Sequence, residues 1–107
     1  MNVILHITTA DAWAAAKAHG SYAADSLATA GFIHCCEERQ LAWVVEAHFP
    51  GRTGLLLLHV DTTRLDAEVK YENLEGGTEL FPHVYGAIPV SAVVAVTTLD
   101  ERVRRSG

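Results

Sequence analysis

The sequence lacks the long apolar runs and the leader that mark membrane and exported proteins. No stretch of its 107 residues approaches the roughly 18 consecutive apolar residues of a membrane span. Met1 and Asn2 lead directly into an apolar stretch, with no charged segment or apolar leader. Internal repeats and low-complexity segments are absent, and 50% of the residues are hydrophobic, which argues against disorder. We therefore expect one cytoplasmic domain over residues 1–107.

Positive charge is also sparse. The chain has 8 Lys and Arg residues against 13 Asp and Glu residues, which gives a formal net charge of −5 at pH 7. Its only basic cluster is Arg102, Arg104 and Arg105, near the end of the chain. Proteins that bind nucleic acids present a stripe of cations to the phosphate backbone, and the sequence encodes no such stripe. We therefore do not expect a nucleic-acid partner.

Cysteine is scarce, with two residues in adjacent positions. A disulfide between neighbours is strained, so Cys35 and Cys36 are expected as thiols. His34 cannot easily activate Cys35 as a nucleophile, because neighbours along a strand point to opposite faces, and a buried structural thiol is favoured. The sequence has no H-x-x-x-H or C-x-x-C pair, so no metal is expected. A zinc-binding module built from His6, His34 and His83 is the less favoured alternative.

The chain does contain three strand-like segments that each carry one histidine among hydrophobic residues: 3–8, 31–36 and 80–86. We predict that His6, His34 and His83 converge on one cleft. A neutral imidazole donates one hydrogen bond and accepts another, which suits it to hold a ribose hydroxyl or to polarise a leaving group. The alternative for each of them is a core histidine bonded to a backbone carbonyl.

Two helices are predicted in the first half of the chain. Ala10–His19 has high helix propensity, and Gly20 follows it as a stop. The second helix covers 37–49, because two glutamates begin it, an apolar stripe repeats at helical spacing, and Pro50 ends it. The segment 20–30 mixes hydroxyl residues with small residues and is predicted as a surface loop that crosses the mouth of the site.

Four strands are predicted in the second half. Leu55–Val60 is continuously apolar, which indicates burial on both faces and a central position in a sheet. The segments 69–72 and 93–99 are further strand candidates. Pro82 removes a backbone donor from the segment 80–86, which predicts an edge or irregular strand. Because these strands are not linked by repeated helical crossovers, the order of elements favours an α+β fold over a doubly wound α/β sheet.

Acidic side chains near the histidine-bearing strands are also candidates for chemistry. Glu72 and Glu79 are the nearest carboxylates in sequence, and either could stabilise a cationic, sugar-like transition state. A solvated position is the alternative for both glutamates. His59 and Asp61 share a strand face and could form an oriented pair. A strand end that enters a polar turn is the favoured interpretation for that pair.

Four short motifs carry a resemblance to a known family: H-I-T at 6–8, S-L at 26–27, G-F-I-H-C at 31–35 and F-P-H-V-Y-G at 81–86. The pattern resembles a small bacterial family of domains of unknown function, over nearly the full length of the chain. That family is similar in fold to the ADP-ribosyltransferases, whose split sheet holds NAD in a cleft between two half-sheets. The resemblance implies an ADP-ribosylation-like split β-sheet of about six strands with two helices.

The resemblance also implies roles for individual residues. His6 and Thr8 match a strand-one histidine and hydroxyl residue that contact the NAD ribose and nicotinamide. Phe32 and His34 look like the second element of such a site. His83 and Tyr85 look like the third, where the ADP-ribosyltransferases often have a glutamate. The predicted catalytic residues are His34 and His83, and the predicted cofactor-binding residues are His6, Thr8, Phe32 and Tyr85.

The expected function is therefore an NAD-binding enzyme of ADP-ribosyl-transfer or NAD-glycohydrolase type, with a small-molecule nucleotide as its partner and no membrane partner. A non-catalytic sensor domain that binds a nucleotide or another small ligand on the same fold is the alternative. The site also resembles the NAD-dependent RNA 2′-phosphotransferases of this fold. Those enzymes need cations for their substrate phosphates, and this chain offers Arg39, Arg52 and Arg64 as scattered single residues, so this activity is ranked lower.

Overall fold

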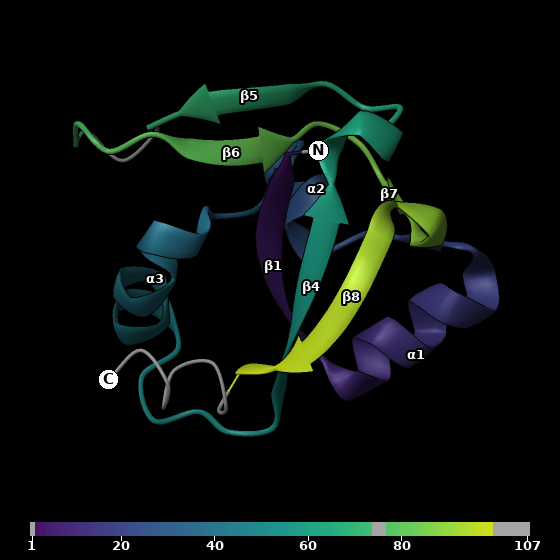
Figure 1. Ribbon diagram of the computed structural model, residues 1–107, viewed down its shortest axis with the longest axis horizontal. Coiled ribbons are helices and arrows are strands. Elements are labelled where there is room, and N and C mark those ends of the chain that lie inside the picture. Colours follow the sequence, from purple (N-terminus) through teal and green to yellow (C-terminus); the bar gives the residue numbers. More distant parts are fainter. Residues whose placement is uncertain (1, 74–76, 100–107) are drawn as a thin grey trace.

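A computed structural model describes residues 2–73 and 77–99 of the chain, and it combines antiparallel sheets with a few helices (Figure 1). One three-stranded sheet has the order β1-β4-β8, with strands Val3–Thr9, Leu55–Asp61 and Val93–Thr98. A second has the order β3-β6-β5, with strands Ile33–His34, Phe81–Val84 and Val69–Glu72. A two-stranded sheet pairs β2 (Ser21–Tyr22) with β7 (Ile88–Pro89). This arrangement agrees with the predicted α+β class.

Backbone hydrogen bonds join the two three-stranded sheets at one point. The N–H of Leu5 in β1 donates to the carbonyl of Cys36 over 2.8 Å, and the N–H of Cys36 donates back to the carbonyl of Leu5 over 2.8 Å. Cys36 lies just beyond β3, so this bridge holds the end of β3 against the middle of β1. The histidines of β1 and β3 are thereby brought close together.

The helices largely follow the sequence, with one addition. Helix α1 spans Ala10–His19, as predicted, and begins with a hydrogen bond from the N–H of Ala12 to the hydroxyl of Thr9. A 3₁₀ turn over Glu38–Gln40 leads into α3 (Leu41–His48), within the predicted helix. The segment 20–30 was predicted as a loop but contains β2 and a third helix, α2 (Asp25–Ala30). Helix α2 ends at Gly31, whose φ of 86° is a left-handed conformation that glycine tolerates.

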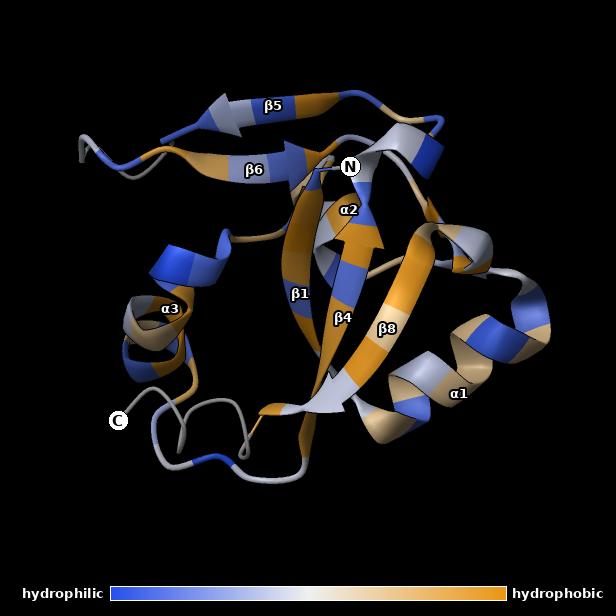
Figure 2. Ribbon diagram, viewed as in Figure 1, coloured by the Kyte–Doolittle hydropathy of each residue, from blue (hydrophilic) through white to orange (hydrophobic). Residues whose placement is uncertain are grey.

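Both faces of the β1-β4-β8 sheet are covered. One face contributes Ile4, Leu58 and Val60 to a core that includes Trp13 of α1 and Tyr22. The opposite face contributes Leu5, Ile7, Leu55 and Leu57 to a second core, against which Val44, Val45 and Phe49 pack. Figure 2 shows β1 and β4 as largely hydrophobic ribbons with single hydrophilic positions. Because His6 shares a face of β1 with Ile4, the strand period buries it.

Strand β6 corrects the prediction made from Pro82. It is the central strand of its sheet, between β3 and β5, and not an edge. The carbonyl of Pro82 accepts from the N–H of Cys35 over 3.1 Å, and the missing N–H of the proline faces the same neighbour. The ladder to β3 therefore stops at the His34–His83 pair, whereas the ladder to β5 remains intact. The proline shortens β3 to two residues, which explains how a central strand accommodates it.

Other predicted elements agree with the structure where it describes them. Strand β4 is central in its sheet, and β5 spans the predicted residues 69–72. Within residues 2–73 and 77–99, no helix is long and apolar enough to span a membrane. The basic cluster of Arg102, Arg104 and Arg105 lies outside the described residues.

Candidate functional site

A cavity of about 470 Å³ lies where α3, β1 and the β3-β6-β5 sheet meet. Pockets of a few hundred Å³ with a mainly apolar wall are typical of small-molecule sites. Among the predicted site residues, His6, Phe32, His34 and His83 line this cavity. Thr8 and Tyr85 do not line it. The three histidine-bearing strands therefore reach one cavity, but their side chains have different surroundings.

One face of the β3-β6-β5 sheet carries the aromatic and polar residues. His34 pairs with His83 across β3 and β6, and Lys70 pairs with His83 across β5 and β6. Opposite and alternate residues share a face, so Phe32, Glu72 and Tyr85 lie on that same face. The other face sends Ile33 and Val84 into the core formed with α1. The alternation of the strands thus separates the core face from the site face.

Glu72 is the centre of a polar cluster on this site face. Its Oε1 accepts a hydrogen bond from the hydroxyl of Tyr85 over 2.5 Å and lies 3.0 Å from Nδ1 of His83. These two hydrogen bonds, with that of Tyr85 the stronger influence, lower the pKa of the Glu72 carboxyl. The same contact raises the pKa of the Tyr85 phenol. Glu72 is therefore an ionised carboxylate at the wall of the cavity.

The carboxylate determines how His83 presents its ring. An ionised carboxylate only accepts hydrogen bonds, so Nδ1 of His83 carries the proton that it shares with Glu72. In the neutral ring, Nε2 then has the lone pair and is the nitrogen that a ligand in the cavity would meet. An imidazole oriented by a carboxylate is suited to accept a proton from a bound nucleophile.

Aromatic rings enclose His83. Phe32 stacks on the His83 ring with centroids 4.2 Å apart and an interplanar angle of 21°. The His34 ring meets Phe32 and His83 edge-on, at centroid distances of 4.8 Å and 5.4 Å. Tyr85 contacts Phe32 from another side at 5.3 Å. The side chain of His34 is exposed, whereas His83 is buried, so His34 lies nearer to the opening of the site.

His6 and Thr8 form a separate cluster with Tyr22, a residue that the sequence did not single out. Nδ1 of His6 donates to the backbone carbonyl of His34 over 2.6 Å, because a carbonyl only accepts. Nε2 of His6 lies 2.8 Å from the hydroxyl of Tyr22, which lies 2.9 Å from Oγ1 of Thr8. Burial lowers the pKa of His6 to about 4, so the ring is neutral and Nε2 accepts from Tyr22.

Hydrogen bonds within the protein therefore occupy both ring nitrogens of His6. His6 and Thr8 are each 7% exposed. The arrangement is that of a core histidine bonded to a backbone carbonyl, which was the alternative considered from the sequence. A direct contact of His6 with a ligand ribose would require the bond to Tyr22 to open. Through the His34 carbonyl, His6 instead holds the strand that carries His34.

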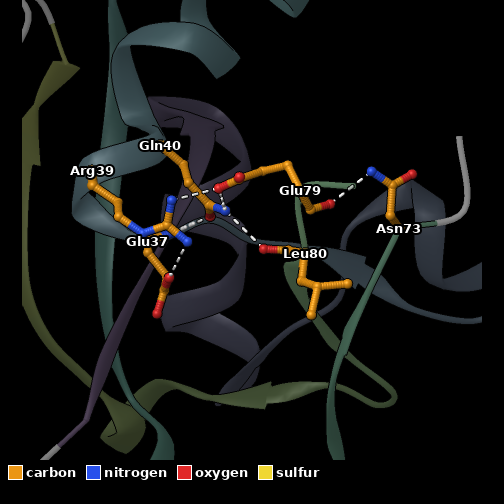
Figure 3. A network of polar contacts seen from close by, with 6 residues as sticks. All are labelled: Glu37, Arg39, Gln40, Asn73, Glu79 and Leu80. Atoms are coloured by element: carbon orange, nitrogen blue, oxygen red, sulfur yellow. Dashed lines mark hydrogen bonds and ion pairs between the residues drawn. The ribbon is translucent and has the colours of Figure 1, made fainter. Parts of the chain in front are cut away.

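Glu79, the other carboxylate considered from the sequence, belongs to a different network (Figure 3). It accepts hydrogen bonds from Arg39 over 2.5 Å and from the buried Gln40 over 2.7 Å. Gln40 also donates to the carbonyl of Leu80 over 2.7 Å and accepts from the N–H of Glu37 over 2.8 Å. These contacts tie the turn before α3 to the start of β6 and so fix two walls of the cavity.

The remaining predicted groups have structural surroundings. Nε2 of His59 lies 2.9 Å from the hydroxyl of Thr97, whereas Asp61 accepts from the N–H of Thr63 over 3.0 Å and caps a 3₁₀ turn. The polar-turn interpretation therefore describes Asp61 correctly. Cys35 and Cys36 are free and buried, and burial raises the pKa of both thiols, that of Cys36 to about 12. Among residues 2–73 and 77–99, no cluster of His, Cys, Asp or Glu side chains could hold a metal ion.

The described wall of the cavity is poor in positive charge. No Lys or Arg is found among the described residues that line it. Arg39 pairs with Glu79 and with Glu37. Arg64 lies 3.5 Å from Asp61, and Arg52 lies over the ring of Phe49. The three scattered arginines therefore have other partners, and the described wall of the cavity suits those groups of a ligand that are neutral or positively charged.

Comparison with known proteins identifies the family. Two structures of protein CC0527 from Caulobacter crescentus are similar to this chain: a crystal structure with 32% identity and a TM-score of 0.80, and a solution NMR structure with 33% identity and a TM-score of 0.77. The match to the crystal structure covers 91% of this chain and 85% of the other chain. The match to the NMR structure covers 92% of this chain and 84% of the other chain. No curated protein matches. The family described as "Protein of unknown function (DUF952)" matches residues 7–96, and the chain belongs to this family.

Proposed function

We propose that this protein binds NAD and transfers its ADP-ribosyl group to an acceptor or to water. The observation that carries the proposal is the Glu72 carboxylate, which His83 and Tyr85 hold at the wall of a partly aromatic cavity. When the bond between ribose and nicotinamide breaks, positive charge develops on the sugar. A fixed carboxylate stabilises that charge, as acidic residues do in glycoside hydrolysis.

The cavity wall also suits the nicotinamide ring. In NAD this ring is aromatic and positively charged, and such rings are attracted to aromatic faces and carboxylates. Phe32, which stacks on His83, supplies an aromatic ring to the cavity, and Glu72 supplies the negative charge. The described wall has no cation that would repel the ring.

The arrangement of the sheets supports the proposed likeness to the ADP-ribosyltransferase fold. Two antiparallel half-sheets meet at the Leu5–Cys36 bridge, and the cavity contacts both of them. The resemblance of the motifs placed His83 where those enzymes often have a glutamate. In this chain Glu72, on the neighbouring strand β5, brings a carboxylate to within hydrogen-bond distance of His83. The carboxylate that the proposed chemistry needs is thus available from a different strand.

Each residue has a specific role in this proposal. Glu72 stabilises the charge on the ribose, and Nε2 of His83 takes the proton of the attacking group. Phe32 supplies a stacking face, and His34 contacts the ligand from the open side of the cavity. Tyr85 holds Glu72 in place. His6 and Thr8 act as supports of the strand that carries His34, instead of contacting the ribose as predicted from the resemblance.

Calorimetry with NAD near pH 7, with nicotinamide release measured in the same samples, tests the proposal. We expect saturable binding with release. Glu72→Gln keeps the size of the side chain but removes its charge, and it should slow release about 100-fold while changing affinity only a few-fold. Glu68→Gln is the matched control, since Glu68 is an exposed carboxylate just before β5. An absence of NAD binding at millimolar concentration would overturn the proposal.

The alternative is a sensor that binds a nucleotide without reacting with it. The occupied hydrogen bonds of His6 and Thr8 favour this alternative, because Tyr22 already binds both of the groups that the resemblance assigns to the ribose. Saturable binding without nicotinamide release, in the presence of varied acceptors and equally in wild type and Glu72→Gln, would favour the sensor over the enzyme.

A further inference from the structure

The cavity has a second, apolar part beside α3. Leu5, Ile7, Val44, Phe49 and Phe81 line it, and all five belong to or pack against the core between β1 and α3. They come from elements other than those of the Glu72 cluster, apart from Phe81, which pairs with Glu72 across β5 and β6. The cavity therefore has a polar end at Glu72 and His83 and a mainly apolar end at α3, where His48 also lines it.

Trp43 lies at the edge of the apolar end. Its side chain is 55% exposed, and its ring is 5.6 Å from that of Phe81. An exposed tryptophan beside an apolar cavity leaves a large apolar surface in contact with water. Water in such a space makes few hydrogen bonds, so an apolar group that displaces it gains free energy.

The charges of the cavity restrict what can occupy it. The polar end offers the Glu72 carboxylate, and no Lys or Arg is among the described lining residues. The nearby cation Lys70 lies over the ring of Tyr85 and does not line the cavity, so a carboxylate or phosphate on the acceptor would meet Glu72 without a cation in the described wall. A hydroxyl or amino group would instead find acceptors, because the His83 ring presents Nε2 and Glu72 is ionised.

We infer that the acceptor of the ADP-ribosyl group is a small, uncharged or cationic molecule with an apolar body and a hydroxyl or amino group. Its apolar body packs against Val44, Phe49 and Phe81, and its nucleophile faces His83. This inference rests on the proposed function. In the reaction, the bond between ribose C1′ and nicotinamide breaks, and nicotinamide leaves with the electron pair. The oxygen of a hydroxyl group, or the nitrogen of an unprotonated amino group, bonds to C1′ through its lone pair, and its proton passes to Nε2 of His83.

Three ligands of one shape test the inference: benzyl alcohol, benzylamine and benzoate, titrated by NMR into the intact protein without NAD. We expect benzyl alcohol and benzylamine to bind, and benzoate to bind at least tenfold more weakly. Val44→Phe fills the apolar end and should weaken the binding of benzyl alcohol and of benzylamine at least tenfold. Ala42→Phe adds the same ring to an exposed position of α3 that does not line the cavity, and it should leave binding unchanged.

Two further measurements keep the test decisive. Trp43→Ala changes an exposed side chain, so it tests the apolar end even if Val44→Phe fails to fold, and weaker benzyl alcohol binding is expected. With NAD present, benzyl alcohol should speed nicotinamide release and yield an ADP-ribosylated alcohol by mass spectrometry. If NAD releases nicotinamide at a rate that benzyl alcohol does not change, and none of the probes binds, the inference is overturned and the proposed function stands. Binding of the probes with no NAD binding or release overturns both.

Discussion

The molecule contains two clusters in which a histidine and a tyrosine share a polar partner, and they differ in what that partner is. In the first, Tyr22 links His6 to the hydroxyl of Thr8, and the remaining nitrogen of His6 bonds to a backbone carbonyl. In the second, Glu72 links His83 to Tyr85. The first cluster is neutral and its hydrogen bonds are directed inward. The second carries a negative charge at the wall of a cavity.

The difference indicates that the hydrogen-bond partners of a histidine, and not its place in a strand, decide whether its ring is available to a ligand. His6 and His83 are 7% and 5% exposed, and both alternate with apolar neighbours. Nevertheless only His83 has a carboxylate to orient it, and only its Nε2 remains for a ligand. We therefore propose that the cluster at Glu72 takes part in chemistry and that the cluster at Tyr22 supports the structure.

The largest effect is expected when His83 loses its ability to take a proton. In His83→Asn the side-chain amide nitrogen takes the place of Nδ1 and can still donate to Glu72, so the fold and the carboxylate should be retained. Nicotinamide release in the presence of an acceptor should fall by about 10² to 10⁴, the usual range for removing a general base. Steady-state kinetics with a thermal melt of the same sample measure both. Release at the wild-type rate would remove His83 from the mechanism.

His6→Ala should act on stability instead of chemistry. It deletes a part-buried hydrogen bond to the carbonyl of His34 and a buried one to the hydroxyl of Tyr22, which keeps its contact with Thr8. We expect a loss of about 3 kcal/mol in the free energy of unfolding. Tyr22→Phe removes only the hydroxyl and should cost about 1–2 kcal/mol. Urea unfolding of the three proteins gives these values, and a His6→Ala protein as stable as wild type would contradict the assignment.

The pH dependence of stability should identify the same histidine. Burial lowers the pKa of His6 from its ordinary value of 6.5 to about 4, so the unfolded chain binds a proton more readily than the folded one. The stability contributed by neutral His6 is therefore complete above pH 6.5 and declines as the pH falls towards 4. The total loss is about 3 kcal/mol. Subtracting the stability curve of His6→Gln from that of wild type isolates this contribution, and a flat difference would contradict it.

The smallest expected effect is a difference in stability between two variants of the hydrogen-bond network that joins α3 to β6 (Figure 3). Gln40 is buried and bonds to backbone groups of Glu37 and Leu80, so Gln40→Ala should cost about 2 kcal/mol. Arg39 is exposed, and its ion pairs with Glu79 and Glu37 are screened by water. Arg39→Ala should therefore shift the melting temperature much less than Gln40→Ala. Equal shifts would show that the ion pairs, and not the buried amide, hold the two elements together.

Local sequence signals predicted much of the fold. Alanine-rich sequence and the Gly20 stop predicted the bounds of α1, and a continuous apolar run predicted β4 as a central strand. Helix α2 was missed because its six residues are too few to show a periodic apolar stripe. The prediction of an edge strand from Pro82 was wrong because a proline disrupts a central strand only where the neighbouring strand needs its missing N–H. The pairing register of β3 and β6 decides this, and it depends on the tertiary structure.

Only part of the candidate site could be predicted, because contacts between strands depend on the tertiary structure. Strand alternation correctly places Phe32 and His34 together, and the structure brings them to His83. Strand alternation could not show that the hydroxyl of Tyr22, in the two-residue strand β2, forms a hydrogen bond with Nε2 of His6. Glu72 was noted only as a nearby carboxylate. Its contact with His83 follows from the register of β5 and β6, in which Lys70 faces His83 and Glu72 lies two residues further along the same face.

We expect a ligand to contact His83 and His34 while both ring nitrogens of His6 keep their hydrogen bonds within the protein. Titration of NAD into protein labelled with ¹⁵N in its histidine side chains, followed by NMR near pH 7, tests this directly. The account predicts that the ring signals of His83 and His34 shift together with the same saturation, while His6 keeps the signals of a neutral ring protonated at Nδ1. A shift confined to His6, with His83 unchanged, would contradict it and restore the strand-one contact that the resemblance implied.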